Sequence, residues 1–281
     1  MTLSTFLIVL FAAALHASWN ALVKSTGDKV VSMTAITIGH APLALLAMPF
    51  VPAPAPESWP YLALSVAIHT GYQISLMQAY RLGDFTQVYP IARGSGPAIV
   101  TAVSLFSLGI VLTTGQVTGI ALIVAGIFCL SLLKQTDGLR NPKAVLAALI
   151  TGCFIAGYSI VDGFGARAAG TAFGFIAWMT TINALVFAII IGIFRPAALK
   201  GVIKEGQKTL WLGGSASVIA YVLVVWAMTQ APIALVTALR ETSTVFALFI
   251  GVLFLKEALT PGKIIATLLT LSGVLMLRIA G

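Results

Sequence analysis

The chain has 281 residues, of which 59% are hydrophobic and 9% are charged, and its formal net charge is +8. Soluble domains carry about 25% charged residues, so this composition excludes a soluble globular protein. The mean hydropathy of +1.04 indicates a polytopic membrane protein instead. Apolar segments fill the sequence and leave no room for a separate soluble domain.

Apolar runs of about 20 residues, each enough to cross a hydrocarbon core of about 30 Å, follow one another with short connections. Residues 1–23 lack the basic leader and the small-residue cleavage site of a signal peptide, so we expect them to form the first span. The sequence therefore predicts an all-α membrane protein with ten transmembrane helices. We expect these at residues 3–23, 32–51, 59–80, 86–108, 115–133, 144–162, 172–194, 209–229, 233–255 and 262–279.

The basic residues fall unequally on the two sides of the predicted membrane. If the spans alternate in direction, twelve Lys and Arg residues lie on one side and only Arg167 and Arg278 on the other. Cytoplasmic loops are enriched in Lys and Arg, so we expect an inner-membrane protein with both termini in the periplasm. The net charge then reflects topology rather than binding to nucleic acid. The twelve are Lys24, Lys29, Arg81, Lys134, Arg140, Lys143, Arg195, Lys200, Lys204, Lys208, Lys256 and Lys263.

The two halves of the chain resemble each other at a fixed offset. Arg93 and Arg240 occupy the same place in this pattern, 147 positions apart, and the same offset relates Gly126 to Gly273. Each half holds five predicted spans, and because five is odd the second half would enter the membrane inverted. We therefore expect two inverted five-helix repeats around a central cavity. The expected parts are a first repeat at 1–135, a polar connector at 136–143 and a second, inverted repeat at 144–281.

Arg93 and Arg240 are the main lead to function. A guanidinium at the centre of a membrane helix costs at least about 2.5 kcal/mol, so each needs a partner, a cavity or a ligand. At 1.5 Å per residue, each lies roughly 10 Å inside its helix, from opposite ends of the inverted repeats. We expect the pair to flank the bilayer midplane and to bind one passing anion.

Proline and glycine surround Arg93 in the segment 90–97, which reads Pro-Ile-Ala-Arg-Gly-Ser-Gly-Pro. Proline removes a backbone donor and clashes with the preceding helical turn. The freed backbone groups are tolerated at membrane depth only where they face a cavity. We expect a kinked or locally unwound helix at 90–97; the alternative is a packing kink in which glycine allows close helix contact.

Two motifs and the duplication resemble the drug/metabolite transporter superfamily, in its ten-span EamA type. The motifs are LHASWNALVK at 15–24 and LFLKEALTPGK at 253–263. The resemblance implies a basket of helices whose cavity is lined by spans one, three, four, six, eight and nine. It also implies transport of a small metabolite, without naming one. The first repeat has Ile110 where the second has Glu257, which favours a structural role for Glu257 at the membrane edge.

Polar and aromatic residues recur at equivalent places in the two halves. His69 and Gln73 lie one helical turn apart, and an offset of 148 relates them to Ser217 and Tyr221. We expect these groups to line a cavity; the alternatives are hydrogen bonds between helices and, for Trp19, an interfacial anchor. The candidate substrate-binding residues are Arg93, Arg240, Trp19, Asn20, His69, Tyr72, Gln73, Tyr158, Ser217 and Tyr221.

Four ionisable residues are candidates for coupling transport to an ion gradient. Glu241 follows Arg240, and adjacent helical residues point about 100° apart, so we expect the two not to neutralise each other; a structural ion pair is the alternative reading of Glu241. Asp162 is either a proton or cation site or a helix-end carboxylate in contact with Arg167. The two histidines have helix–helix hydrogen bonding as the alternative. The coupling candidates are Glu241, Asp162, His16 and His40.

Several function classes lack their motifs. The sequence has no Gly-x-x-x-x-Gly-Lys-Ser/Thr loop, no His-Glu-x-x-His and no Gly-x-Ser-x-Gly. Cys129 and Cys153 lie in apolar spans without neighbouring ligands, and free buried cysteine behaves as a small hydrophobe. We therefore expect no enzyme activity, no cofactor and no metal site.

The sequence predicts a secondary transporter that works by alternating access. Its expected cargo is a small anionic or zwitterionic metabolite such as an amino acid or an organic acid. The expected partners are this solute, the lipid bilayer and protons as the coupling ion, in a monomer or homodimer, with no nucleic acid. The alternatives are an exporter of amphipathic drugs or cations, a membrane enzyme, and a non-transporting sensor or structural protein.

Overall fold

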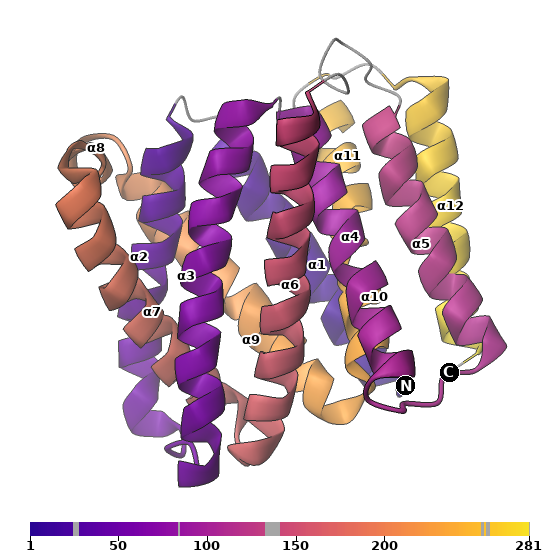
Figure 1. Ribbon diagram of the computed structural model, residues 1–281, viewed down its shortest axis with the longest axis horizontal. Helices are drawn as coiled ribbons and strands as arrows, with labels where there is room; N and C mark the ends of the chain where they lie inside the picture. The colour runs from indigo at the N-terminus through magenta and orange to yellow at the C-terminus, as the bar shows by residue number, and fades with distance from the viewer. Residues whose placement is uncertain (25–27, 84, 133–140, 254–255, 257–258, 281) are drawn as a thin grey trace.

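A computed structural model describes residues 1–24, 28–83, 85–132, 141–253, 256 and 259–280. All regular structure in these ranges is helical, and Figure 1 shows the long helices side by side, running between two ends of the molecule. The predicted all-α class is confirmed. The long helices are α1 (Leu3–Lys24), α2 (Lys29–Ala47), α3 (Trp59–Leu82), α4 (Phe85–Phe106), α5 (Thr114–Leu132), α6 (Pro142–Ala168), α7 (Ala172–Phe194), α9 (Gly214–Gln230) and α12 (Pro261–Ile279).

Shorter helices complete the fold. The 3₁₀ turns η1 (Met48–Phe50) and η2 (Pro56–Ser58) join α2 to α3, and α8 (Pro196–Lys204) follows α7. A π-helical turn, η4 (Thr209–Gly213), leads into α9. The predicted ninth span consists of two helices, α10 (Ile233–Arg240) and α11 (Ser243–Leu253).

Seven helical stretches in the described ranges are long and apolar enough to cross a membrane. They are α1, α2 with η1, α6, α7, η4 with α9, α10 with α11, and α12. α5 is a shorter apolar helix, and α3 and α4 are not among the seven because polar residues such as Gln73 and Arg93 lower their hydropathy. The chain is a multi-pass membrane protein.

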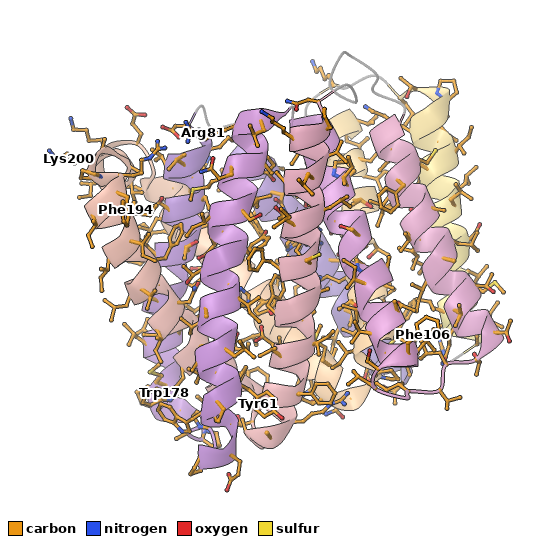
Figure 2. All side chains as sticks on the ribbon, in the orientation of Figure 1. Tyr61, Arg81, Phe106, Trp178, Phe194 and Lys200 are labelled. Carbon is orange, nitrogen blue, oxygen red and sulfur yellow. The ribbon has the colours of Figure 1, made fainter. Side chains whose placement is uncertain are left out.

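Charged and aromatic residues mark the two ends of the molecule. Figure 2 shows Arg81 and Lys200 at the upper end and Tyr61 and Trp178 at the lower end. The start of α1 and the last residues of α12 both lie towards the lower end (Figure 1). Aromatic side chains concentrate at membrane interfaces, and the rings of Trp59 and Trp178 pack edge to face with centroids 5.5 Å apart.

Polar caps fix where several helices begin. The Asp28 side chain accepts hydrogen bonds from the backbone at the start of α2, and Thr171 does so for α7. Asn141 caps α6 and also donates from Nδ2 to the Leu82 carbonyl at 2.7 Å. Each cap satisfies backbone donors that have no partner within the helix. Asn141 thereby joins the start of α6 to the end of α3.

Helix α4 is continuous through Pro90 and Pro97, so the predicted local unwinding at 90–97 is wrong. The glycines of this segment serve close packing instead. A Cβ on Gly96 would lie 2.7 Å from Ile155 Cγ2 of α6, and a Cβ on Gly152 of α6 would lie 3.1 Å from a carbonyl oxygen of α4. The segment therefore brings α4 against α6, as the alternative interpretation of these glycines expected.

A break occurs in the second half of the chain, at Glu241 and Thr242 between α10 and α11. The Thr242 hydroxyl donates to the Leu239 carbonyl at 2.8 Å, and the Thr244 hydroxyl donates to the Glu241 carbonyl at 2.8 Å. The same two carbonyls also accept from the Thr242 and Thr244 amides, at 3.1 and 3.0 Å, so each hydroxyl adds a second hydrogen bond that stabilises the turn. Glu241 therefore lies at a turn in mid-span rather than on a regular helix face.

The helices pack in a pattern that surrounds the centre of the bundle. α1 packs on α9, α3 on α6, α2 on α7 and α5 on α12. In the α5–α12 contact, Gly119 faces Gly273. Small residues at such positions allow two membrane helices to approach closely.

The contact between α5 and α12 is tested by Gly273→Ala. The added Cβ would lie 2.5 Å from the Gly119 carbonyl oxygen and 2.8 Å from Ile123 Cγ1, so the overlap should lower the free energy of unfolding by about 1–3 kcal/mol. Gly157→Ala is the matched control, because its nearest atom, Ile68 Cγ2, is 3.6 Å away. We expect a lower melting temperature in detergent for Gly273→Ala alone; equal melting of both variants would contradict this packing.

Candidate functional site

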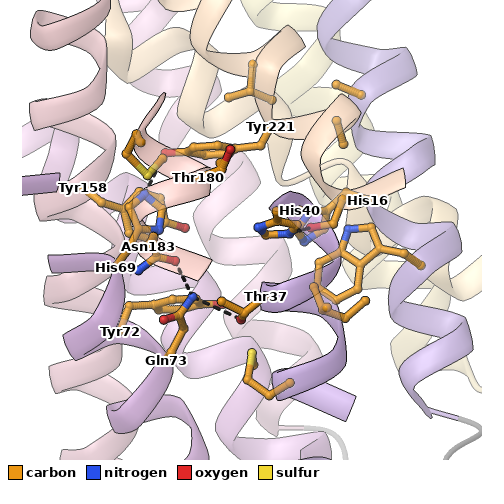
Figure 3. A pocket seen from close by; sticks show the side chains of 18 of the residues that line it. His16, Thr37, His40, His69, Tyr72, Gln73, Tyr158, Thr180, Asn183 and Tyr221 are labelled. Atoms are coloured by element: carbon orange, nitrogen blue, oxygen red, sulfur yellow. Dashed lines mark hydrogen bonds between the residues drawn. The ribbon is translucent and has the colours of Figure 1, made fainter. Parts of the chain in front are cut away.

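A central cavity of about 90 Å³ lies in the middle of the bundle. Side chains from α1, α2, α3, α4, α6, α7, α9 and α10 line it. In Figure 3, His69 and Tyr158 lie on one side of this space, and His16 and His40 lie on the other. The cavity therefore collects residues from both halves of the chain.

The candidate substrate-binding residues come together around this cavity with one exception. Asn20 lines a smaller, adjoining pocket of about 30 Å³, and its Nδ2 donates to the His16 carbonyl of its own helix at 2.8 Å. The remaining nine line the central cavity: Arg93, Arg240, Trp19, His69, Tyr72, Gln73, Tyr158, Ser217 and Tyr221.

The cavity wall also includes two helices that the family resemblance did not imply. α2 contributes Thr37 and His40, and α7 contributes Thr180 and Asn183. All six spans that the resemblance implied (one, three, four, six, eight and nine) contribute to the wall, and α2 and α7 add to them. Asn183 is a single amide within the apolar run 172–194. A polar residue isolated in an apolar span is the sequence feature that could have identified it as a cavity residue.

The two arginines lie on the cavity wall with Glu241 buried between them. Arg93 Nε donates to Glu241 Oε2 at 2.9 Å, and Arg93 Nη2 donates to Ser243 Oγ at 3.4 Å. Arg240 Nε lies 3.7 Å from Glu241 Oε1, which is an ion pair without a hydrogen bond. Two guanidiniums against one carboxylate leave this cluster with one positive charge.

Arg240 differs from Arg93 in its hydrogen bonding. Its side chain is 3% exposed, and no described residue accepts a hydrogen bond from its Nε or Nη2. Its Cζ lies 5.9 Å from the centre of the Tyr158 ring, a cation–π contact. A buried charged group without hydrogen bonds is costly, so these two donors of Arg240 lack the acceptors that a guanidinium at this depth needs.

The prediction that Arg240 and Glu241 would point apart is wrong. Neighbouring residues face different directions only in a continuous helix. α10 instead ends at Arg240, and Glu241 lies in the turn before α11. This turn lets the Glu241 carboxylate reach both guanidiniums.

A second polar cluster surrounds Asp162, which is fully buried. Its Oδ2 lies 2.9 Å from His69 Nε2 and accepts a hydrogen bond from the Tyr221 hydroxyl. His69 stacks on Tyr158 with ring centroids 4.3 Å apart. The alternative contact between Asp162 and Arg167 is wrong, because the Arg167 guanidinium donates to carbonyls at the end of α9 and beyond it.

Amide and hydroxyl groups from three helices form a third buried cluster, shown in Figure 3. Gln73 Nε2 donates to Asn183 Oδ1 at 2.9 Å and to Thr37 Oγ1 at 3.2 Å. Asn183 Nδ2 donates to Thr70 Oγ1 at 3.2 Å. These bonds fix the Gln73 amide so that its Oε1, which has no partner among the described residues, remains an available acceptor.

Both predicted histidines of the first two spans line the cavity. His40 Nε2 lies 3.1 Å from Ser217 Oγ, so it bridges α2 and α9. His16 packs edge to face on Trp19 with centroids 4.9 Å apart. Trp19 Nε1 is buried and has no hydrogen-bond partner among the described residues, so the indole supplies another donor beside the cavity.

Glu257, the metal-ligating residue types and the two cysteines are the remaining sequence features. Glu257 lies outside the described residues, so its predicted structural role at the membrane edge has no structural counterpart here. Among the described ranges, no three His, Cys, Asp or Glu residues are grouped so as to hold a metal ion. Both cysteines in these ranges, Cys129 and Cys153, are free thiols.

Comparisons with known proteins place this site in a family context. Residues 142–279 match the EamA-like transporter family. A solved crystal structure of another protein aligns with 99% of this chain and 99% of that chain, with a TM-score of 0.81 and 18% sequence identity. At this identity the likeness shows the fold alone. Among curated proteins, none matches this chain.

The amide cluster is tested by a double-mutant cycle. Asn183→Leu would remove the bond from Gln73 Nε2 to Asn183 Oδ1 and the bond from Asn183 Nδ2 to Thr70 Oγ1, so we expect the free energy of unfolding to fall by about 1–3 kcal/mol. The double variant Gln73→Leu/Asn183→Leu should cost less than the sum of its two single variants, because both partners become apolar.

Melting temperatures in detergent measure these differences. Thr181→Val is the control, since the Thr181 hydroxyl bonds only to the Ala177 carbonyl of its own helix. Strictly additive costs for Gln73→Leu and Asn183→Leu would contradict a coupled network.

Proposed function

Because the chain belongs to the EamA-like transporter family, within the drug/metabolite transporter superfamily, we propose that it is a secondary transporter of a small anionic or zwitterionic metabolite. An amino acid or an organic acid is the proposed class of solute. The solute would bind in the central cavity, and gradients rather than ATP would drive its movement by alternating access.

The observation that carries this proposal is Arg240. Its buried guanidinium lies on the cavity wall with two donors that no described residue accepts. A planar guanidinium binds a carboxylate through two parallel hydrogen bonds. With Arg93 on the same wall and one net positive charge in the cluster, the site favours an anionic group of the solute.

The other candidate residues supply shape and orientation in this proposal. Tyr72, Tyr158, Tyr221 and Trp19 would surround the apolar part of the solute. His69, Gln73 and Ser217 would orient its polar groups, with Asn20 at the adjoining pocket. Protons are the proposed coupling ion, with Asp162, His16 and His40 as candidate carriers; Asp162 is favoured because it is fully buried and hydrogen-bonded to two cavity residues.

The small volume of the cavity supports a site that widens when solute enters. A volume of about 90 Å³ is smaller than the 150 Å³ or so that holds benzene in an engineered protein cavity. A solute larger than the smallest amino acids would therefore need the helices to separate. Widening and closing of the central space is what alternating access requires.

We further propose ten spans arranged as inverted repeats at 1–135 and 144–281. The packing supports this proposal. In the proposed repeats α1 corresponds to α6 and α3 to α9, so the α1–α9 contact in one arrangement corresponds to the α6–α3 contact in the other. The α2–α7 and α5–α12 contacts each join two corresponding helices. A two-fold axis in the membrane plane generates this pattern, and it places the shared cavity between the repeats.

Other functions fit the site less well. An exporter of cations would have to place its cargo beside two guanidiniums, which repel it. A sensor or structural protein would need its arginines fully paired, whereas Arg240 has unsatisfied donors. A membrane enzyme would need reactive groups gathered at one interface, whereas this site lies in mid-bundle.

Single substitution of the arginines tests the proposed function. Arg240→Gln should lower uptake of ¹⁴C-labelled amino acids into proteoliposomes by about tenfold or more, because a hydrogen bond to a charged group contributes about 1.5–3 kcal/mol. Arg93→Gln should also lower uptake, since it removes the second guanidinium from the cavity wall.

Arg167→Gln is the matched control for these variants. Its guanidinium bonds to backbone carbonyls, 3.0 Å from the Ala231 oxygen, and does not line the cavity. Uptake per folded molecule should therefore persist. Unchanged uptake in Arg93→Gln and Arg240→Gln, with both proteins folded, would refute the anion site.

The proposed location is the inner membrane, with both termini in the periplasm. In a background of Cys129→Ala and Cys153→Ala, a cysteine at Lys200 should react with a membrane-impermeant maleimide only in inside-out vesicles. A cysteine at Glu57, in the exposed turn η2, should react only in intact cells. The reverse pattern would invert the proposed topology.

A further inference from the structure

Glu241 connects the two cavity arginines through one carboxylate. Its Oε2 accepts from Arg93 Nε at 2.9 Å, whereas its Oε1 lies 3.7 Å from Arg240 Nε. Oε1 has no hydrogen-bond partner among the described residues, although Glu241 is fully buried. The carboxylate is therefore held closely by one guanidinium and loosely by the other.

A solute carboxylate would offer Arg240 the same chemistry that Glu241 offers Arg93. The Nε and Nη2 atoms of Arg240, which lack partners, share one edge of the planar guanidinium. Carboxylates bind this edge through two parallel hydrogen bonds. Glu241 and a solute anion are thus alternative counter-ions for the same pair of arginines.

We propose that Glu241 is an internal counter-anion, which compensates the cavity arginines when no solute is bound and so allows the empty carrier to reorient. The proposal rests on the transport function given above. Without Glu241, an empty cavity would close around two uncompensated guanidiniums, which is strongly unfavourable in a water-poor interior. With solute bound, its carboxylate supplies the compensating charge.

The position of Glu241 suits this role. The residue lies in the break between α10 and α11, where the local backbone is held by the Thr242 and Thr244 hydroxyls. Short interruptions of this kind absorb backbone rotation in moving proteins. The carboxylate can therefore change its distance to the two guanidiniums without unwinding a long helix.

The inference predicts that net transport and exchange separate in Glu241→Gln. Proteoliposomes would receive a ¹⁴C-labelled mixture of proteinogenic amino acids, with the unlabelled mixture inside for exchange or no amino acids inside for net uptake. The wild-type chain should support both modes. Glu241→Gln should retain exchange but lose net uptake by at least about tenfold, because only the empty carrier needs the internal carboxylate.

Three further variants make the test specific. Glu57→Gln makes the same chemical change at an exposed turn and should keep both modes, and Glu241→Asp keeps the negative charge and should keep net uptake. If Glu241→Gln does not fold, Arg93→Gln/Glu241→Gln removes the closely bonded pair together, which is better tolerated. That double variant should show a lower ratio of net uptake to exchange than Arg93→Gln alone, because Arg240 then has no carboxylate beside it when the carrier is empty.

The outcomes separate the two proposals. An equal effect of Glu241→Gln on both modes, or no effect on either, would overturn the counter-anion while leaving the transporter. If the wild-type chain exchanged solute but showed no net uptake, the counter-anion role of Glu241 would be overturned as well. Absence of both modes in the wild type would overturn the proposed transport of amino acids, and the role of Glu241 would fall with it.

Discussion

The cost of burying two guanidiniums in the middle of a membrane bundle constrains the rest of this structure. Arg93 and Arg240 are 3% and 2% exposed, respectively, and neither is stable at this depth without compensation. Glu241 compensates one charge, and its position depends on the break between α10 and α11. Arg240 lines the central cavity, and its Nε and Nη2 are buried without a hydrogen-bond partner among the described residues. Helix geometry, charge balance and cavity are thus connected through three side chains.

Several buried polar atoms in and beside the cavity wall have no hydrogen-bond partner among the described residues. Arg240 Nε and Nη2 and Trp19 Nε1 are donors, which suit an anionic group, and Glu241 Oε1 is an acceptor beside Arg240. Gln73 Oε1 and Asp162 Oδ1 are unsatisfied acceptors on other parts of the wall and behind it. Unpaired buried polar groups destabilise a protein unless a ligand or water completes them. These groups are the reason for proposing a solute that carries both an anionic group and a hydrogen-bond donor.

The sequence located most of the cavity because duplication and polarity are visible in it. The offset between Arg93 and Arg240 predicted that both belong to one central site, and both line the cavity. Asn183 was missed because a lone amide in an apolar helix shows nothing about which neighbours it meets. Local unwinding at 90–97 was wrongly predicted because glycine permits either an unwound helix or close packing, and only the continuous helix and the contact with Ile155 show the packing. The orientation of Glu241 depended on a turn that no residue pattern marks, since Thr and Ser are common inside membrane helices.

The most direct test of the anion site changes the ligand rather than the protein. Proteinogenic amino acids and their α-carboxamides differ in one negative charge and little in shape. Ligand binding to the folded state raises the melting temperature by mass action, so thermal unfolding in detergent measures both series on the same scale. The account predicts that at least one amino acid stabilises the protein while its α-carboxamide does not. Equal stabilisation by both members of each such pair would contradict a site built on Arg93 and Arg240.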